Sequence, residues 1–426
     1  MGTGGHHGQQ CPRSGGRIIL TRTLAYLSGA PRVSTRPEAE TSGPRSHVLG
    51  VMEGFRDLGW EVKPFILGDK LPAWLSSAGS EQLTVGGGWR TLAADAARLA
   101  LRPMVPGLAR FELGADVDWA YERFAVMQQL GAAFQRRGVP WILETNSPAS
   151  REAFRERKSI RLLARALELE RKAYLECDVL ICVSERLKLL LVRDMQMPER
   201  KIVVAPIGVD PRIYDPALTR PAHADGQFTI GFVGRLYPWQ ALDTLFHGAR
   251  VARDRGAPYL NIVIVGSGIA EREFRLAAES AGPGVKVEFV SQIPMHAVPS
   301  YISSFDLTFV GPKAMDRQGM YFSPVKLLEY MAMAKPVLCA NYEALAELVQ
   351  EGVTGFLFEP GDPGSLAEAI LRGIRARGRL AEMGQRARQV ILRGHTWRGR
   401  VADVVAQVEE ILVQSGRVGA PVNRTT

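Results

Sequence analysis

The chain has 426 residues, and 46% of them are hydrophobic, which is enough for two cores of roughly 200 residues each. Its formal net charge of +9 at pH 7 favours an anionic partner, such as a nucleotide, a phosphate, nucleic acid or an acidic membrane surface, without choosing among these. No apolar run approaches the roughly 20 residues that span a bilayer, and the four cysteines, Cys11, Cys177, Cys182 and Cys339, lack the spacing of a zinc site.

The first sixteen residues, MGTGGHHGQQCPRSGG, contain no apolar segment. They predict a disordered N-terminus over 1–16 and not a signal peptide. Scattered cysteines are typical of a reducing compartment. We therefore expect a cytoplasmic location, with peripheral contact at the inner face of the membrane left open.

The first half of the chain alternates short apolar runs with helical patterns. The predicted strands are 17–20, 61–65, 141–144, 179–183 and 201–204. The predicted helices are 46–58, 120–137, 153–176 and 185–195. Residues 70–115 are rich in Gly, Ala and Pro, and the pattern predicts no order of elements there. We expect an N-terminal Rossmann-like domain over 17–208.

The second half alternates more regularly, after a proline-rich linker predicted at 209–226. The predicted strands are 229–233, 262–265, 285–290, 307–310, 337–339 and 356–358. Six strands with helices between them indicate a doubly wound parallel sheet, which places a second Rossmann-like domain at 227–398. A helix over 399–414 is expected to pack back on the N-terminal domain, followed by a tail at 415–426.

Together these elements predict an α/β protein with two doubly wound parallel-sheet domains that face a central cleft. Ligands of open α/β sheets bind outside the carboxyl ends of the strands. A nucleotide-dependent enzyme with two domains is therefore the class that the pattern favours.

The stretch SPVKLLEYMAMAKPV (323–337) contains a helix start with two possible meanings. Ser323 is a preferred N-cap and Pro324 fits the first helical position, while Lys326 and Glu329 share one face. One interpretation is an ordinary capped helix with a weak ion pair. The other is an anion site, in which the amides of 324–326 and the lysine bind a phosphate.

Two glycine turns are expected at the same edge of the second sheet. The first strand of this half ends at Gly234, and Arg235 follows, where a guanidinium can bind a phosphate with two parallel bonds. Gly266-Ser-Gly268 favours a tight turn over a dinucleotide fingerprint, because the third glycine is absent. Arg235 and Lys326 together would neutralise most of a diphosphate, and Glu329 can accept the hydroxyls of a ribose.

Several motifs carry a family resemblance over roughly residues 17–412. They are TSGPRSHV, YERF, ILETNSPASREA, DVLICVSERLK and KIVVAPIGVDPRIYDP in the first half, and FVGRLYPW, the turn at 266–268, YFSPVKLLEYMAMAKPV and GVTGFLFEPGD in the second. The chain resembles the retaining glycosyltransferases of family four, which have the GT-B fold. The resemblance implies that the N-terminal domain binds the acceptor and the C-terminal domain the nucleotide sugar.

The resemblance also implies roles for individual residues. Arg235 and Lys326 would hold the donor diphosphate and Glu329 the ribose, which makes these three the expected catalytic set. The implied donor-binding residues are Gly234, Gln240, Tyr321, Phe322, Ser323, Pro324, Val325 and, from the other domain, Gly43.

Three positions depart from the family pattern. Gln240 stands where many members have a lysine, and Tyr321 stands where they have an acid. Asn146 stands where many have a histidine, on the side of the acceptor and donor sugar. Gln240 cannot supply the charge of a lysine, a loss that Lys326 is expected to offset. The other two positions bear on how the donor sugar is oriented and do not remove the diphosphate site.

The expected reaction moves a hexose from a nucleoside-diphosphate sugar to a hydroxyl of a glycan, a lipid-linked or a secondary-metabolite acceptor, with retention at the anomeric carbon. Polysaccharide biosynthesis is the expected setting, and no metal or other cofactor is required when fixed cations stabilise the leaving diphosphate. A GT-B epimerase or phosphorylase, and an inactive nucleotide-sugar-binding protein, remain as alternatives. A nucleic-acid partner is not expected, because aromatic and basic residues do not interleave on an exposed strand.

Two further segments have competing interpretations. Asp-Val-Asp at 116–118 is similar to a metal-binding motif, but we predict a solvated helix start there. Residues 151–172 contain eight basic and four acidic residues. They favour a solvated helix with ion pairs over a helix that contacts anionic lipid.

Overall fold

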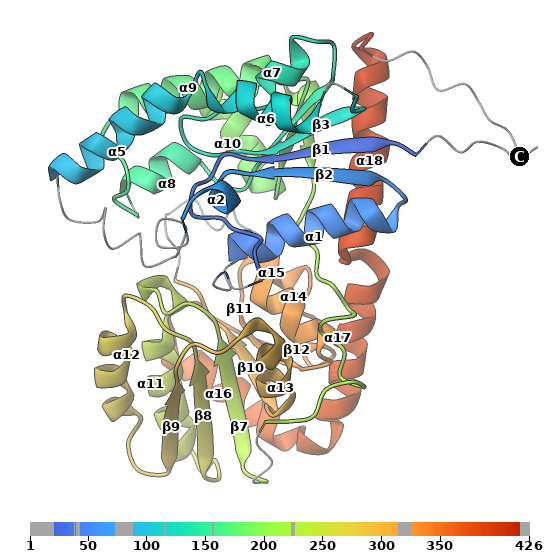
Figure 1. Ribbon diagram of the computed structural model, residues 1–426. Helices are drawn as coiled ribbons and strands as arrows, with labels where there is room; N and C mark the ends of the chain where they lie inside the picture. Colours follow the sequence, from blue (N-terminus) through green and yellow to red (C-terminus); the bar gives the residue numbers. More distant parts are fainter. Residues whose placement is uncertain are drawn as a thin grey trace, which may run out of the picture.

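The computed structural model describes residues 21–37, 39, 43–72, 88–114, 116–155, 157–222, 226–313 and 325–417. The chain forms two halves, each built on a six-stranded sheet (Figure 1). The strand orders are β2-β1-β3-β4-β5-β6 and β12-β11-β10-β7-β8-β9, and all recorded strand pairs are parallel. This arrangement confirms the predicted pair of doubly wound sheets.

In the described part of the chain the N-terminal half contains strands β1 to β6 and the helices that precede β6. Its strands are β1 (Thr23–Ser28), β2 (Glu61–Ile66), β3 (Trp119–Arg123), β4 (Trp141–Thr145), β5 (Val179–Cys182) and β6 (Ile202–Val204). Its helices are α1 (Gly43–Asp57), α2 (Leu67–Lys70), α5 (Gly88–Leu101), α6 (Val105–Leu113), α7 (Ala132–Gln135), α8 (Ala149–Arg155), α9 (Leu163–Glu176) and α10 (Glu185–Met195).

The C-terminal half contains the remaining elements. Its strands are β7 (Phe228–Val233), β8 (Leu260–Val265), β9 (Val285–Val290), β10 (Leu307–Val310), β11 (Val337–Ala340) and β12 (Gly355–Phe358). Its helices are α11 (Leu242–Asp254), α12 (Glu271–Ala278), α13 (Val298–Ser303), α14 (Val325–Ala332), α15 (Glu343–Ala346), α16 (Pro363–Arg375) and α17 (Leu380–Gly394), and α18 (Trp397–Gln414) follows.

The predicted helix at 120–137 is wrong. Residues Trp119–Arg123 form β3, a central strand between β1 and β4. Asp-Val-Asp at 116–118 is therefore not a helix start: Asp118 accepts a hydrogen bond from the backbone N–H of Thr23 at 2.7 Å, where β1 begins. Tertiary contacts override helix propensity here, because Glu122 is buried and accepts the N–H groups of Leu130 and Gly131 at 2.9 and 2.8 Å.

Two other boundaries differ from the prediction. The first strand begins at Thr23, and the predicted strand at 17–20 lies outside the described residues. The predicted helix at 153–176 is divided into α8 and α9. The unassigned stretch 70–115 contains α5 and α6.

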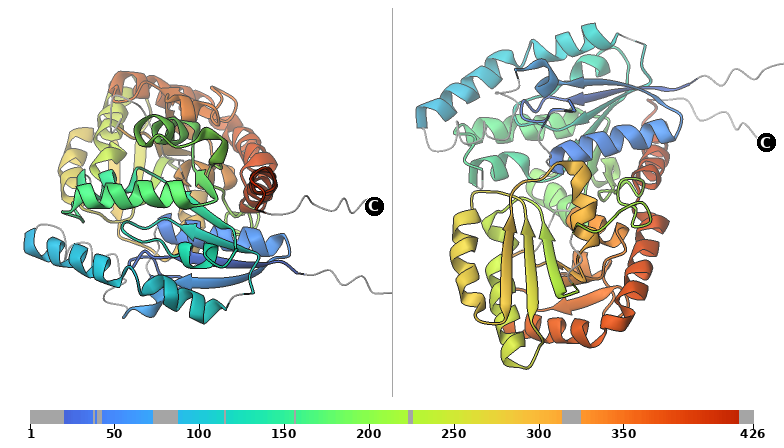
Figure 2. Two further views of the ribbon diagram at one scale, coloured as in Figure 1. Left: turned by 90° about the horizontal axis from the view of Figure 1, so that it is seen from above. Right: turned by 60° about the horizontal axis from the view of Figure 1, so that its bottom comes forward.

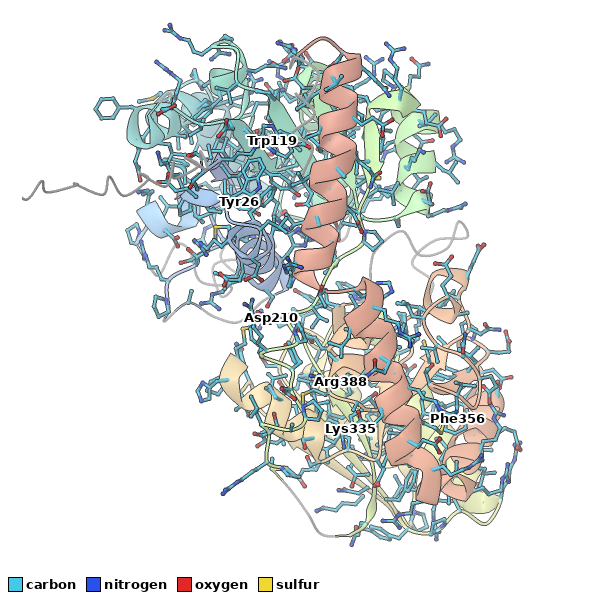
Figure 3. The ribbon with its side chains drawn as sticks, turned by 90° about the vertical axis from the view of Figure 1, so that its right-hand side faces the viewer. Tyr26, Trp119, Asp210, Lys335, Phe356 and Arg388 are labelled. Carbon is cyan, nitrogen blue, oxygen red and sulfur yellow. The ribbon has the colours of Figure 1, made fainter. Side chains whose placement is uncertain are left out.

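Helix α18 follows α17 from the C-terminal half and packs against α1 and the N-terminal core (Figures 1 and 3). Figure 3 labels Arg388 in the lower half, Tyr26 and Trp119 in the upper half, and Asp210 of the linker between them. The contact is close because α1 presents small residues: a Cβ on Gly50 would lie 2.1 Å from Trp397 Cε2. A Cβ on Gly54 would lie 2.6 Å from Val401 Cγ2.

A buried ionic network fixes α18 to the N-terminal sheet. Glu144, at the end of β4, pairs with Arg400 of α18 and lies 2.9 Å from His47 Nε2 of α1. The hydroxyl of Tyr121 donates to the second oxygen of Glu144 at 2.8 Å, and Arg400 Nε donates to the carbonyl of Pro206 at 2.9 Å. Burial lowers the pKa of His47 against the opposing effect of Glu144, whose own pKa is held below its usual range by His47 and Arg400 in spite of burial.

The packing of α1 on α18 predicts the effect of adding one methyl group. Gly50→Ala should lower the free energy of unfolding by about 1–3 kcal/mol, because the rigid indole of Trp397 leaves no room for a Cβ. Gly107→Ala on α6 is the control, since its Cβ would meet nothing within 4 Å. Urea unfolding monitored by circular dichroism measures both, and equal stability of Gly50→Ala and wild type would contradict the packing.

Candidate functional site

The turns that follow β7 and β8 lie against each other at the carboxyl edge of the C-terminal sheet. Gly234 has φ +150° and its N–H donates to the carbonyl of Val265 at 2.9 Å. Gly266 has φ +132°, and a Cβ there would lie 2.1 Å from the Gly234 carbonyl oxygen. Both positions therefore need glycine, for conformation and for the close approach of two backbones.

Helix α14 is attached to the same edge by a buried tyrosine. The hydroxyl of Tyr330 accepts the N–H of Val233 at 2.7 Å and lies 3.2 Å from the Val233 carbonyl, to which it can donate. This contact holds Lys326 beside the first turn, so that a Cβ on Gly234 would lie 2.4 Å from Lys326 Cε and 3.2 Å from its Nζ. The structure thus brings Gly234 and Lys326 together. The ammonium also lies 5.2 Å from the centre of the Phe232 ring.

Lys326 and Glu329 occupy a partly buried position on α14. Burial lowers the pKa of Lys326 to about 8, with Glu329 acting in the opposite direction. Burial raises the pKa of Glu329 to about 7, opposed by Tyr214 and Lys326. In the described part of the chain the two side chains form no ion pair within 4.0 Å, so the ordinary i,i+3 pair of the first interpretation is not present.

Tyr214 is a site residue that the sequence analysis missed. It lies in the linker, and its hydroxyl donates to Glu329 Oε1 at 2.7 Å. Arg388 of α17 donates to the Tyr214 carbonyl at 2.7 Å and so fixes the linker at this point. An aromatic residue within a proline-rich linker was the only available signal, and it did not identify the partner.

Arg235 follows Gly234 and is partly exposed. Its guanidinium donates a long hydrogen bond of 3.5 Å to Gln292 Oε1, which also accepts from Ser267 at 3.3 Å. Among the described residues no carboxylate pairs with Arg235. Gln240 ends the short 3₁₀ helix η2 (Pro238–Gln240), next to the stacked rings of Tyr237 and Trp239.

The remaining predicted site residues have different outcomes. Tyr321, Phe322, Ser323 and Pro324 lie outside the described residues, so their predicted roles stay predictions. Val325, the first residue of α14, packs against the hydrophobic core of the N-terminal half, so this helix contacts the other half directly.

Two predicted residues lie on the N-terminal half. Gly43 begins α1, and a Cβ there would meet nothing within 4 Å. Asn146 follows β4, and its Oδ1 is buried without a hydrogen-bond partner. At the same junction Arg45 of α1 contacts the sulfur of Met295 in the C-terminal half at 4.0 Å. The roles of Gly43 and Asn146 remain predictions.

The described residues provide neither a metal cluster nor a membrane-spanning helix. No group of three or more His, Cys, Asp or Glu side chains lies where it could hold a metal ion. None of the described helices combines the length and the hydropathy that crossing a bilayer requires.

Two family models match the chain. The model described as "Glycosyl transferases group 1" matches residues 218–390, and the model described as "Glycosyl transferase 4-like domain" matches residues 42–208. Together they cover most of both halves. The chain belongs to the group 1 glycosyltransferases of the family-four type, as the resemblance predicted.

Individual relatives match part of the chain. The amylovoran biosynthesis glycosyltransferase AmsK of Erwinia amylovora is 27% identical over 179 residues, which are 42% of this chain and 43% of the relative. A D-inositol 3-phosphate glycosyltransferase of Nocardia farcinica is 29% identical over 231 residues, which are 51% of this chain and 49% of the relative. The chain thus matches about half of the length of these relatives or less.

Solved structures share the fold. The sucrose-phosphate synthase of Thermosynechococcus elongatus has a TM-score of 0.66 at 18% identity and covers 92% of this chain and 100% of its own. HepE of Anabaena, in complex with UDP and glucose, has a TM-score of 0.58 at 17% identity and covers 93% and 100%. The likeness, at these identities, concerns the fold alone, and it confirms the predicted GT-B arrangement.

The raised pKa of Glu329 predicts a dependence of stability on pH. The pKa of this carboxyl is about 7 in the folded chain, against about 4.3 when exposed. Its contribution to the free energy of unfolding is therefore complete below the lower pKa, and it is lost as pH rises through the higher pKa. Relative to Glu329→Gln, wild type should lose about 1–3 kcal/mol of unfolding free energy between pH 5 and pH 8.

Urea unfolding of both proteins at several pH values measures this difference. Glu279→Gln, which changes an exposed carboxyl of the same half, is the matched control and should give a flat difference. A flat difference for Glu329→Gln as well would show that the Glu329 side chain is not desolvated.

Proposed function

We propose that this chain is a glycosyltransferase that moves a hexose from a nucleoside-diphosphate sugar to an acceptor hydroxyl with retention at the anomeric carbon. The observation that carries the proposal is the position of Lys326 against Gly234, at the carboxyl edge of the C-terminal sheet. Arg235 follows this glycine in the chain, and Glu329 lies one helical turn beyond the lysine.

The proposed chemistry depends on negative charge that grows on the diphosphate as the glycosidic bond lengthens. Lys326 and Arg235 would stabilise this charge more strongly in the transition state than in the ground state. Partial burial of the lysine makes its charge act through a lower dielectric than water, and a bound diphosphate would raise its pKa again, keeping it protonated. Glu329, held by Tyr214, would accept the ribose hydroxyls.

Under this proposal the two fixed cations take the place that a divalent metal has in other transferases, so no metal is required. The relatives named above support a polysaccharide or small-polyol setting and a nucleotide-sugar donor. They also support a working enzyme over the inactive nucleotide-sugar-binding alternative, which transfer assays decide. The same assays would identify the base and the sugar of the donor. They would also show how Gln240, Tyr321 and Asn146 affect the choice of sugar.

The proposal assigns the acceptor to the N-terminal domain and the donor to the C-terminal domain, with the domain boundaries that were expected from the sequence. A cytoplasmic location is part of the proposal.

Contact of residues 151–172 with anionic lipid was the less favoured interpretation of this segment, and it is not part of the proposal. Basic residues of this segment form ion pairs, such as Arg151 with Asp194 at 2.8 Å, which favours the solvated-helix interpretation. Exposed apolar side chains gather instead on α5 and α6, at the outer edge of the N-terminal half in Figure 2, where Trp89 is 73% and Phe111 87% exposed.

The proposed roles predict the behaviour of two alanine variants. Lys326→Ala and Glu329→Ala should each lower transfer by about 10²–10³-fold, since each removes a preorganised group from the site. Both should also weaken the binding of nucleoside diphosphate. Lys286→Ala, which removes an exposed lysine of β9, is the matched control and should keep full activity.

A thermal-shift panel of nucleoside diphosphates and nucleotide sugars identifies the donor, and transfer of labelled sugar measures activity. Nucleotide binding by wild type without transfer to any acceptor would support the inactive alternative. Undiminished transfer by Lys326→Ala would remove the lysine from the mechanism.

A further inference from the structure

Polar side chains form a row at the carboxyl edge of the N-terminal sheet. Ser28 of β1 pairs in register with Arg123 of β3, and Arg123 pairs with Glu144 of β4. Paired residues of neighbouring parallel strands project to the same face, here the face on which Glu144 meets α1 and α18. Tyr26 and Tyr121, two residues earlier on β1 and β3, share this face, and their rings stack at 5.6 Å.

In the described part of the chain the guanidinium of Arg123 forms no ion pair within 4.0 Å, and Glu144 and Glu152 act on it only at longer range. Both carboxylates are already engaged: Glu144 by the buried network described above, and Glu152 by Ser147 and Arg157. The Nε of Arg123 is buried without a hydrogen bond. Arg123 as a whole is partly exposed, and burial lowers the pKa of its guanidinium against the opposing effects of Tyr26, Glu144 and Glu152.

Two buried hydroxyls lie in the same row. Tyr26 and Ser28 are both 0% exposed, and neither hydroxyl has a hydrogen-bond partner. An unsatisfied buried polar group costs about 1–3 kcal/mol, so two of them beside an unpaired guanidinium are not explained by stability. One guanidinium with two hydroxyl donors is the chemistry that binds a carboxylate or a phosphate.

We propose that Arg123, with the hydroxyls of Tyr26 and Ser28, binds an anionic group of the acceptor, so that the acceptor is an acidic sugar that carries a carboxylate or a phosphate. The inference rests on the proposed function, which assigns the acceptor to the N-terminal half. The donor diphosphate has its own cations, Arg235 and Lys326, on the other half. The cationic side chain on the N-terminal half is therefore available for a negatively charged group of the acceptor.

The test compares acidic and neutral probes of one ring. Isothermal titration of glucose, glucuronate and glucose 6-phosphate into wild type, with and without a saturating nucleoside diphosphate, should show at least about tenfold tighter binding of one or both acidic probes. Arg123→Gln should abolish this preference, and Arg123→Lys should keep part of it. Arg137→Gln, which changes an exposed arginine before β4 at the opposite edge of the sheet, should keep all of it.

Each other outcome overturns the inference. Wild type that binds the acidic probes no better than glucose, or binds none of the three, has no acidic subsite. A preference that survives in Arg123→Gln belongs to other residues. If Arg123→Gln weakens nucleoside diphosphate as strongly as the acidic probes, the guanidinium serves the donor. Thermal unfolding of each variant confirms that it is folded.

Failure of the proposed function has a separate signature. A chain that binds no nucleoside diphosphate would still show the acidic preference, if the subsite exists, in the titrations without nucleotide.

Discussion

The hydrogen bonds between the Tyr330 hydroxyl and the backbone of Val233 decide where α14 begins relative to the C-terminal sheet. Because the helix is held there, the stem of Lys326 lies in the space that a side chain at 234 would occupy. Gly234 and Lys326 therefore depend on each other, because a side chain at 234 would displace the lysine from this position. Arg235 follows Gly234 in the chain, and Glu329 lies one helical turn after Lys326 on α14.

Much of the fold follows from the sequence because most strands of the C-terminal half are short apolar runs. β9 and β10 were predicted with the bounds that the structure has. β3 was missed since its sequence, WAYER, contains helix formers and two charged residues. Of its two charged residues, Glu122 is explained by a tertiary contact, the N–H groups that it accepts, and Arg123 lies unpaired at the carboxyl edge of the sheet. No local sequence pattern reports either situation.

The candidate site was predictable where it depends on the edge of one sheet, and not where it depends on distant contacts. Gly234 and Lys326 meet because β7 ends and α14 begins at the same edge of the sheet, which the α/β pattern already requires. Tyr214 meets Glu329 across 115 positions of the chain, and Arg400 meets Glu144 across 256. The contact between Arg400 and Glu144 joins the two halves, because α18 follows the C-terminal half and brings Arg400 to the end of β4 in the N-terminal sheet. The candidate site, the linker and α18 are thus connected through α14, Tyr214 and α17.

The most direct test of this account is a crystal structure of the chain with a bound nucleoside diphosphate. We expect phosphate oxygens within hydrogen-bond distance of Lys326 Nζ and of the Arg235 guanidinium, and the ribose hydroxyls at Glu329, with Tyr214 still donating to that carboxylate. A diphosphate bound away from the Gly234 turn, with the lysine and the arginine directed at protein carboxylates, would contradict it.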